Sequence, residues 1–248
     1  MLAGLLAVGC SPSVPPLGTP DSLTRQIVAQ RVSAVVVTRH ASIGNWSRGH
    51  LPDIYQHEDV DGGSAAPISA DGYFLTADHV LERTQSGRHA FVIYHLDGSL
   101  VTAKARVVWR CATADVALLH APLKTPFFYD WTPPQNRLPV GTRVIHGGIS
   151  SGLKPGSGKL ATALAPEYPF TGARKFEIDI PLQPGDSGGP VVDAHGDLVG
   201  INSAVEFLVP MDTAFFVDSE GIRPNTQMIA QLIKSDRARK RSANPPAQ

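Results

Sequence analysis

One stretch of eight residues constrains this chain more than any other: Gln183-Pro184-Gly185-Asp186-Ser187-Gly188-Gly189-Pro190. A serine among small, flexible residues can lie on a tight turn with its hydroxyl exposed. Gly185 lets the backbone turn sharply, so the amides of Gly185 and Ser187 can point at one spot. Two such amides would hold the negative oxygen of a tetrahedral acyl intermediate, as an oxyanion hole does. The alternative is an ordinary glycine-rich turn without a chemical role.

The same stretch fits the looser pattern G-x-S-x-G, which is the nucleophile elbow of α/β-hydrolases. That fold places its acid and then its histidine after the serine. Only 61 of the 248 residues follow Ser187, and His195 is the one histidine among them. A βαβ unit takes about 30 residues, so little more than one further unit could follow. The partners of the serine must therefore lie upstream, in the order His, Asp, Ser.

The composition is that of an ordinary globular protein, with 42% hydrophobic and 18% charged residues. The 22 basic and 22 acidic residues give no net charge, which does not support a nucleic-acid partner. The 23 glycines and 21 prolines favour short strands joined by turns over a helical bundle. The two cysteines are Cys10 and Cys111, and with Cys10 used at the N-terminus they form no disulfide framework. Cys111 is expected to be an inert thiol.

The N-terminal residues Met1–Gly9 are almost wholly apolar, but nine residues are too few to span a bilayer. They resemble the end of a secretory signal that runs into the lipobox Ala7-Val8-Gly9-Cys10, although no Lys or Arg precedes the run. We therefore expect an exported lipoprotein of the cell envelope that faces the periplasm, with a lipid on Cys10 as its only membrane contact. A secreted protein with a cleaved signal, or a meaningless apolar start, is the alternative.

From Val32 onwards the sequence predicts two sets of six short strands. The first set is Val32–Arg39, Ser64–Ser69, Tyr73–Thr76, Ala90–Leu96, Ser99–Trp109 and Asp115–His120. The second set is Thr142–Ile149, Gly158–Leu164, Lys175–Ile180, Gly189–Asp193, Asp197–Ala204 and Thr213–Val217. Six strands suffice to close a sheet without exposed edges. The predicted fold class is all-β, with two six-stranded antiparallel barrels over residues 31–121 and 141–218.

The remaining segments surround these barrels. We expect a signal segment at 1–10, a tether at 11–30 with a short helical stretch at its end, and a proline-rich connector at 122–140. A C-terminal helix is predicted at 219–236, followed by a disordered basic tail at 237–248. The segment Ala41–Gly63 carries His50 and His57 among acidic residues, but it lacks metal-ligand spacing, so a solvated loop is favoured over a metal site.

Two upstream residues complete a candidate constellation with Ser187. His79 ends the segment Gly72–His79, where a strand enters a turn. Asp115 opens an apolar strand, a position where an unpaired buried carboxylate is costly. Alone, His79 would more often be a surface residue and Asp115 a cap or turn residue. Together with Ser187 they stand in the order that the nucleophile stretch requires.

These segments, with Leu198-Val199-Gly200-Ile201-Asn202-Ser203, resemble the trypsin-like serine proteases of the chymotrypsin double-barrel superfamily. The bacterial form with the greatest similarity is the protease domain of the HtrA (Deg) group. The resemblance implies His79 as the general base, Asp115 as its orienting acid and Ser187 as the nucleophile, with an oxyanion hole formed by the amides of Gly185 and Ser187.

The resemblance also implies a function and a substrate site. The function is that of a serine endopeptidase that forms an acyl-enzyme, with polypeptides as substrates and without a cofactor or a metal. Ser203, Ala204 and Val205 would form the strand beside which an extended peptide docks. A protease-like domain that binds peptides without cutting them, or that needs an activating partner, is the competing hypothesis. An esterase on the same scaffold is chemically allowed, but the peptide-docking strand favours proteolysis.

The chain departs from its relatives at Asp186 and at its C-terminus. HtrA proteases carry PDZ domains, whereas about thirty residues follow the second predicted barrel here. Asp186 stands where HtrA proteases commonly have Asn. In trypsins this acid pairs with an N-terminus freed by cleavage, but Arg25-Gln26-Ile27-Val28 offers no such junction. We therefore expect another partner for Asp186, either Arg143 or Arg174.

Three further positions bear on activity and specificity. The side chain of Asp78 is expected to point away from that of its neighbour His79, so activity should survive this unusual residue. Val205 stands where trypsin has a pocket-wall glycine, and Pro181 stands where trypsin has its pocket acid. The chain is therefore predicted to prefer a small or apolar side chain, and not Lys or Arg, at the cleavage position.

Overall fold

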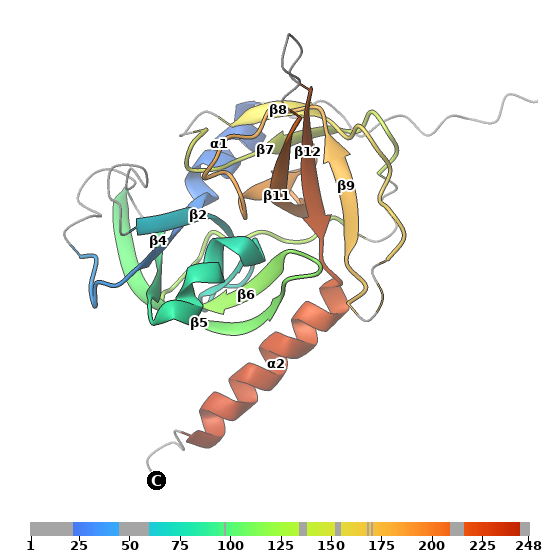
Figure 1. Cartoon of the computed structure of the whole chain (residues 1–248). Helices are drawn as coiled ribbons and strands as arrows, with labels where there is room; N and C mark the ends of the chain where they lie inside the picture. The colour runs from blue at the N-terminus through green and yellow to red at the C-terminus, as the bar shows by residue number, and fades with distance from the viewer. Residues whose placement is uncertain are drawn as a thin grey trace, which may run out of the picture.

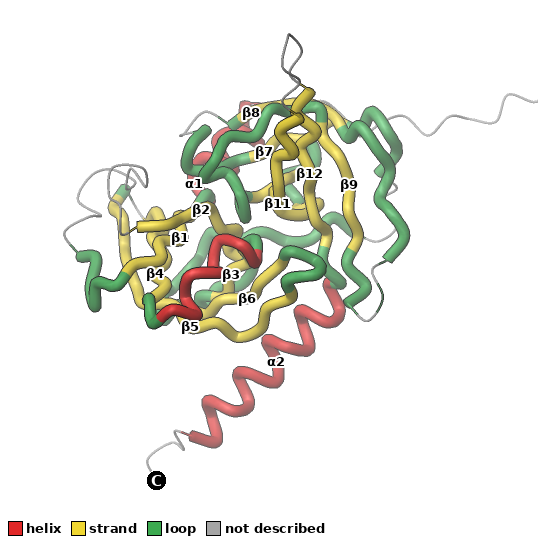
Figure 2. Tube along the Cα trace, in the orientation of Figure 1, coloured by secondary structure: helices red, strands yellow, loops and turns green. Residues whose placement is uncertain are grey.

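The computed structural model describes residues 22–44, 60–96, 98–133, 138–151, 155–167, 169, 171–208 and 216–243, with the backbone alone at 204–208, 216–218 and 243. Within these residues two six-stranded antiparallel sheets lie next to one another (Figure 1). The predicted all-β class, with two six-stranded units and a C-terminal helix, is confirmed. Figure 2 shows the strands of both sheets joined by loops, with helix α1 beside the second sheet and helix α2 below the first.

The first sheet is a closed barrel with the strand order β1-β2-β3-β6-β5-β4. Its strands are β1 (Ser33–Thr38), β2 (Val60–Pro67), β3 (Tyr73–Thr76), β4 (His89–Leu96), β5 (Ser99–Cys111) and β6 (Val116–His120). Alternating side chains such as Val35 and Val37 point inward and pack with Phe74, Tyr94 and Leu119. A 3₁₀ helix, η1 (Asp78–Ser86), leaves β3 and packs against β1 and β2.

The second sheet has the order β8-β7-β10-β11-β12-β9. Its strands are β7 (Arg143–His146), β8 (Gly156–Lys159), β9 (Arg174–Ile178), β10 (Pro190–Val192), β11 (Leu198–Leu208) and β12 (Phe216–Arg223). An isolated antiparallel bridge between Leu160 and Ile178 joins its two outer ends. The sheet is therefore curled around its core of Val144, Phe176 and Val191, but it is less completely closed than the predicted barrel.

The end of the predicted tether is a packed helix, α1 (Ser22–Arg31). Val28 is fully buried, and the hydroxyl of Thr24 donates a hydrogen bond to the carbonyl of Ala194 at 3.1 Å. The short helix expected at the end of the tether is thus present, but one face of it packs against the second sheet, so the residues from Ser22 onwards are not a tether.

The C-terminal helix α2 (Thr226–Ala243) begins and ends seven residues later than the predicted 219–236, because the residues up to Arg223 belong to β12. The buried carboxylate of Asp236 accepts hydrogen bonds from the hydroxyl of Tyr73 at 2.8 Å and from Arg106 at 2.6 Å. In the next position, Arg237 contacts Asp71 with two bonds of 2.6 and 2.9 Å. These contacts hold α2 under the first barrel (Figure 1), so the predicted disordered tail is wrong up to Ala243. No helix in the described ranges is both long and apolar enough to cross a bilayer.

The helix η1 is fixed to the barrel by a buried ion pair. Both carboxylate oxygens of Asp78 accept bonds from the guanidinium of Arg110 on β5, at 2.6 and 2.8 Å. Asp78 thus turns to Arg110, whereas its neighbour His79 turns to Asp115, as expected for adjacent side chains.

Removing Arg110 tests the contribution of this pair to stability. Arg110→Met leaves the Asp78 carboxylate buried without its cation, and because the Arg110 side chain is a quarter exposed we expect a loss of about 2–3 kcal/mol in unfolding free energy. Urea denaturation measures it, and Lys104→Met on the same strand is the control. Equal stability of the two variants would show that the ion pair does not hold η1.

Candidate active site

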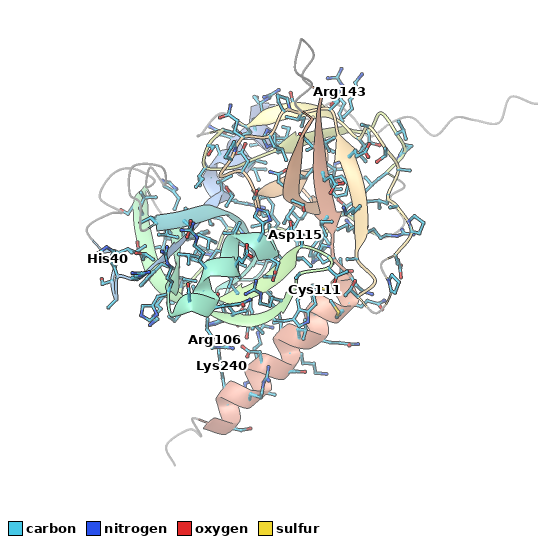
Figure 3. The ribbon with its side chains drawn as sticks, viewed as in Figure 1. His40, Arg106, Cys111, Asp115, Arg143 and Lys240 are labelled. Carbon is cyan, nitrogen blue, oxygen red and sulfur yellow. The ribbon has the colours of Figure 1, made fainter. Side chains whose placement is uncertain are left out.

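A histidine and an aspartate from two separate elements of the first barrel meet at its surface. Nδ1 of His79, on η1, lies 3.0 Å from each carboxylate oxygen of Asp115, which precedes β6. The backbone N–H of His79 also donates to Asp115 at 3.0 Å. Two contacts from one residue fix both the position and the ring orientation of the imidazole. Figure 3 shows Asp115 in the middle of the molecule, between the two sheets.

Asp115 adopts an unusual backbone conformation. Its φ of +46° is in the left-handed region, where Asp and Asn are the side chains most often tolerated after glycine. The Asp115 N–H donates to the carbonyl of Ala112 at 3.2 Å, so the residue closes a tight turn before β6. The turn directs the carboxylate towards His79 rather than into the barrel.

Ser203 of β11 is a second partner of this carboxylate. Its hydroxyl donates to Oδ2 of Asp115 at 2.5 Å, a contact between the two sheets. Sequence reasoning assigned Ser203 to substrate binding alone and missed this role, because 88 positions separate the two residues. The sequence signal that could have indicated this role is a hydroxyl residue soon after the apolar stretch that begins at Leu198.

These contacts lower the pKa of Asp115 and raise the pKa of His79. Burial raises the pKa of Asp115, but the hydrogen bonds from His79 and Ser203 and the charge of His79 outweigh it, so the pKa lies below its ordinary value. The hydrogen bond to Asp115 raises the pKa of His79, against the opposing effect of burial. The charges of Asp115, Asp78 and Glu82 raise it further.

The serine stretch forms a tight turn in the second sheet. The N–H of Asp186 donates to the carbonyl of Gln183 at 2.9 Å, and Gly185 has a φ of +100°. Proline followed by a residue of positive φ is the arrangement of a type II turn, which explains Pro184-Gly185 at its centre. In this turn type the central peptide has the opposite orientation to that in a type I turn.

Two hydroxyl groups hold the peptides of this turn. Ser150 donates to the carbonyl of Pro184, and the buried Ser64 of β2 donates to the carbonyl of Gly185 at 2.7 Å. Because the N–H of a trans peptide points opposite to its carbonyl, the Gly185 N–H points away from Ser150. Within the described chain, the N–H groups of Gly185 and Ser187 have no hydrogen-bond partner. Both donors are therefore available to a ligand.

The backbone of Ser64 also joins the serine stretch to the first barrel. Its N–H donates to the carbonyl of Ser187 at 2.8 Å. Gly188 has a φ of +85°, and a Cβ there would lie 2.2 Å from the carbonyl oxygen of Ser64. Only glycine permits this approach of the two sheets, so the sequence after the serine is set by packing.

Neutral donors satisfy the buried carboxylate of Asp186. It accepts bonds from the N–H and hydroxyl of Ser151, at 2.9 and 2.6 Å, and from the N–H of Gln183 at 3.0 Å. The expected pairing with Arg143 or Arg174 is therefore wrong, because Ser151 in the loop before β8 supplies two donors and Gln183 of the turn supplies a third. Arg143 lies at the outer side of the second sheet (Figure 3).

Ser187 and His79 border one cavity of about 420 Å³ between the sheets. Gly185 and Pro184 line it from the second sheet, together with residues of β2 and η1 from the first: Val60, Asp61, Gly62, Val80, Glu82 and Arg83. No hydrogen bond links the Ser187 hydroxyl to His79 among the described residues. Such contacts often shorten only when a substrate binds.

Other predicted positions are less informative. Ala204 and Val205 belong to β11, but only their backbone is described. Cys10, His50 and His57 lie outside the described residues, so lipidation and loop predictions there remain predictions. Cys111 is a free thiol and is partly buried.

Comparison with known proteins identifies the family. A model described as "Trypsin-like peptidase domain" matches residues 63–201, which include Ser64, His79, Asp115 and Ser187. The match covers more than half of the chain, so the chain belongs to this family. It resembles in fold the solved structure of the HtrA-type protease AlgW with a tripeptide, with a TM-score of 0.57 and 21% identity, over 87% of this chain and 63% of that one.

The curated relatives are named probable periplasmic serine endoproteases of the DegP-like type. The protein from Brucella suis is 30% identical over 195 residues, or 71% of this chain and 33% of the relative. The protein from Pseudomonas fluorescens is 30% identical over 66% of this chain and 36% of the relative. The chain thus spans about a third of the length of these relatives.

The titration of His79 tests the electrostatics of the site. Its pKa should lie above the ordinary histidine value, and Glu82→Gln should lower it, because removal of a negative charge disfavours the imidazolium. NMR titration of the imidazole resonances measures both. Glu177→Gln on β9 is the control and should leave the titration unchanged, whereas an equal change in both variants would contradict the assignment.

Proposed function

We propose that this chain is a serine endopeptidase in which Ser187 is the nucleophile, His79 the general base and Asp115 the acid that orients it. The observation that carries the proposal is the double contact of Asp115 with His79, beside the cavity that His79 shares with Ser187. Family membership and the names of the relatives support the same activity.

The mechanism follows from the proton affinities of these groups. A serine hydroxyl is a poor nucleophile at neutral pH, so His79 accepts its proton as Ser187 attacks the peptide carbonyl. His79 then gives this proton to the leaving amine, which leaves an acyl group on the serine. Water then attacks the acyl group while His79 accepts its proton. His79 returns the proton to Ser187, and the carboxylic acid product is released. Asp115 keeps the proton of His79 on Nδ1, so that Nε2 is free to act as base, and stabilises the imidazolium.

The transition state needs donors for its negative oxygen. The free N–H groups of Gly185 and Ser187 are suited to this role, and removal of one such donor typically slows catalysis by about 10²–10³-fold. The contact of Ser150 with the Pro184 carbonyl favours the orientation in which the Gly185 N–H is available. The oxyanion hole is thus part of the proposal, and the turn requires no cleavage to form it.

The substrates that we propose are extended polypeptides. β11 passes beside Asp115 at Ser203, and the backbone of Ala204 and Val205 continues the strand along which a peptide can add. The relatives are named periplasmic, which supports an exported protein that meets its substrates in the periplasm. A lipid on Cys10 is part of this proposal.

Cleavage-site profiling with a peptide library tests the substrate preference. Small or apolar residues should dominate before the cut bond, because Pro181 and Val205 replace the acid and the glycine of a trypsin-type pocket. The frequencies are read by mass spectrometry of the products. Dominance of Lys or Arg at that position would contradict the specificity but leave the catalytic assignment intact.

Labelling with a fluorophosphonate probe tests the catalytic assignment. The wild type should be labelled, and Ser187→Ala and His79→Ala should lose labelling and at least about 10⁴-fold in peptide hydrolysis. Ser242→Ala and His195→Ala, which lie away from the cavity, are matched controls.

The probe also separates the competing hypotheses. Labelling that persists in Ser187→Ala would reject this nucleophile. An unlabelled wild type that binds peptides would favour a protease-like binding domain, or one that needs a partner. A labelled protein that cleaves esters but no peptide would favour an esterase.

A further inference from the structure

A second cavity, of about 320 Å³, lies at the end of the second sheet, where β9, β12 and the start of α2 meet. It shares no lining residue with the cavity of His79 and Ser187. Its polar lining includes Arg174, Arg223 and the first residues of α2, and its apolar lining includes Leu138 and Leu164. The proposed mechanism uses none of these residues.

The two arginines form a pair of like charges. Arg174 of β9 and Arg223 of β12 are directly opposite in the antiparallel pairing of their strands. No carboxylate lies within ion-pair distance of either guanidinium in the described part of the chain. Two neighbouring cations without a counter-ion are unfavourable, and an anion between them would relieve the repulsion.

The two guanidinium groups are satisfied to different degrees. Arg223 donates to the backbone carbonyls of Val199 at 2.9 Å and Thr132 at 2.8 Å, and it lies over the ring of Trp131. Burial, and then the charge of Arg174, lowers the pKa of Arg223 below its ordinary value. Nε of Arg174 is buried and has no hydrogen-bond partner. A buried N–H without a partner is rare, and it marks a place where a ligand or water is expected.

The start of α2 adds two more donors. The side chain of Asn225 caps the helix by accepting a bond from the N–H of Met228 at 3.0 Å. The N–H groups of Thr226 and Gln227, residues that line the cavity, have no partner among the described residues. The positive end of this 18-residue helix therefore faces the same space as the arginines.

Acidic groups near the cavity do not fill it. Glu167 lines the cavity, but it is exposed and forms no ion pair with either arginine. Asp193 acts on Arg223 through its charge, but its carboxylate already accepts bonds from Thr132, His195 and Asp197. An added anion would thus meet an excess of free donors and one opposing carboxylate at the rim.

We propose that this cavity binds a small organic oxyanion, a phosphate or carboxylate group attached to an apolar body. Arg174 contacts two oxygens with its fork of N–H groups, the amides of Thr226 and Gln227 contact the anion from the helix end, and Leu138 and Leu164 contact the apolar part. The volume exceeds what a bare phosphate needs, which is why an organic anion is favoured.

Calorimetric titration of the purified chain at constant ionic strength tests the site with three probes: inorganic phosphate, phenyl phosphate and benzoate. Saturable binding of one molecule per chain is expected for phenyl phosphate or benzoate, with weaker binding of inorganic phosphate. The two organic probes decide between a phosphate and a carboxylate head.

Matched variants locate the binding. Arg174→Gln should weaken binding by at least about 10-fold, the effect of a lost charge-assisted hydrogen bond. Glu167→Gln should tighten it, because the opposing charge is removed. Arg143→Gln, an exposed arginine of the same sheet, should leave it unchanged. If Arg174→Gln unfolds, Arg174→Lys keeps the charge but should still bind more weakly, because it lacks the two-pronged contact.

The proposal is overturned if none of the probes binds at about 10 mM, which is about ten times the Kd of a weak ligand with 1 mM affinity. Binding that is unchanged in a folded Arg174→Gln variant also overturns it. So does binding that appears only in Glu167→Gln, because Glu167 would then be the internal counter-ion. None of these outcomes depends on peptidase activity, so they do not test the catalytic assignment.

Discussion

The buried carboxylate of Asp186 is the constraint on which the nucleophile turn depends. A carboxylate without solvent needs hydrogen bonds or a cation, since its desolvation costs several kcal/mol. Here Ser151 and Gln183 supply three neutral donors, and no ammonium group is required. The carboxylate therefore ties the turn around Gly185 to the loop before β8, and the positive φ of Gly185 is held in place. The turn is formed without a free N-terminus.

The candidate site depends on the way in which the two sheets pack against each other. His79 and Asp115 belong to the first sheet, whereas Ser187 and Ser203 belong to the second. Two serines join the sheets: Ser203 donates to Asp115, and Ser64 contacts the turn around the nucleophile. These contacts require a glycine at position 188, because any side chain there would force the sheets apart. A change in sheet packing therefore changes the geometry of the site.

Local patterns predicted the parts of the structure that local chemistry determines. Strand β3 has the predicted bounds of Tyr73–Thr76, and the order of the three site residues followed from chain length after Ser187. The partner of Asp186 was wrongly predicted, because Ser151 is 35 positions away and reaches it only through a loop without periodicity. The extent of α2 was missed for the same reason, since Asp236 meets Tyr73 across 163 positions.

An active-site titration tests the central claim, that the turn and the His79–Asp115 pair are competent as folded. The freshly purified chain is first checked by mass spectrometry, to verify that no cleavage has occurred at or beyond Ser22. It is then mixed with a chromogenic ester. Rapid acylation followed by slow hydrolysis should release a burst of about one product molecule per chain. A burst that appears only after cleavage near α1, or only with an added partner, would contradict the account.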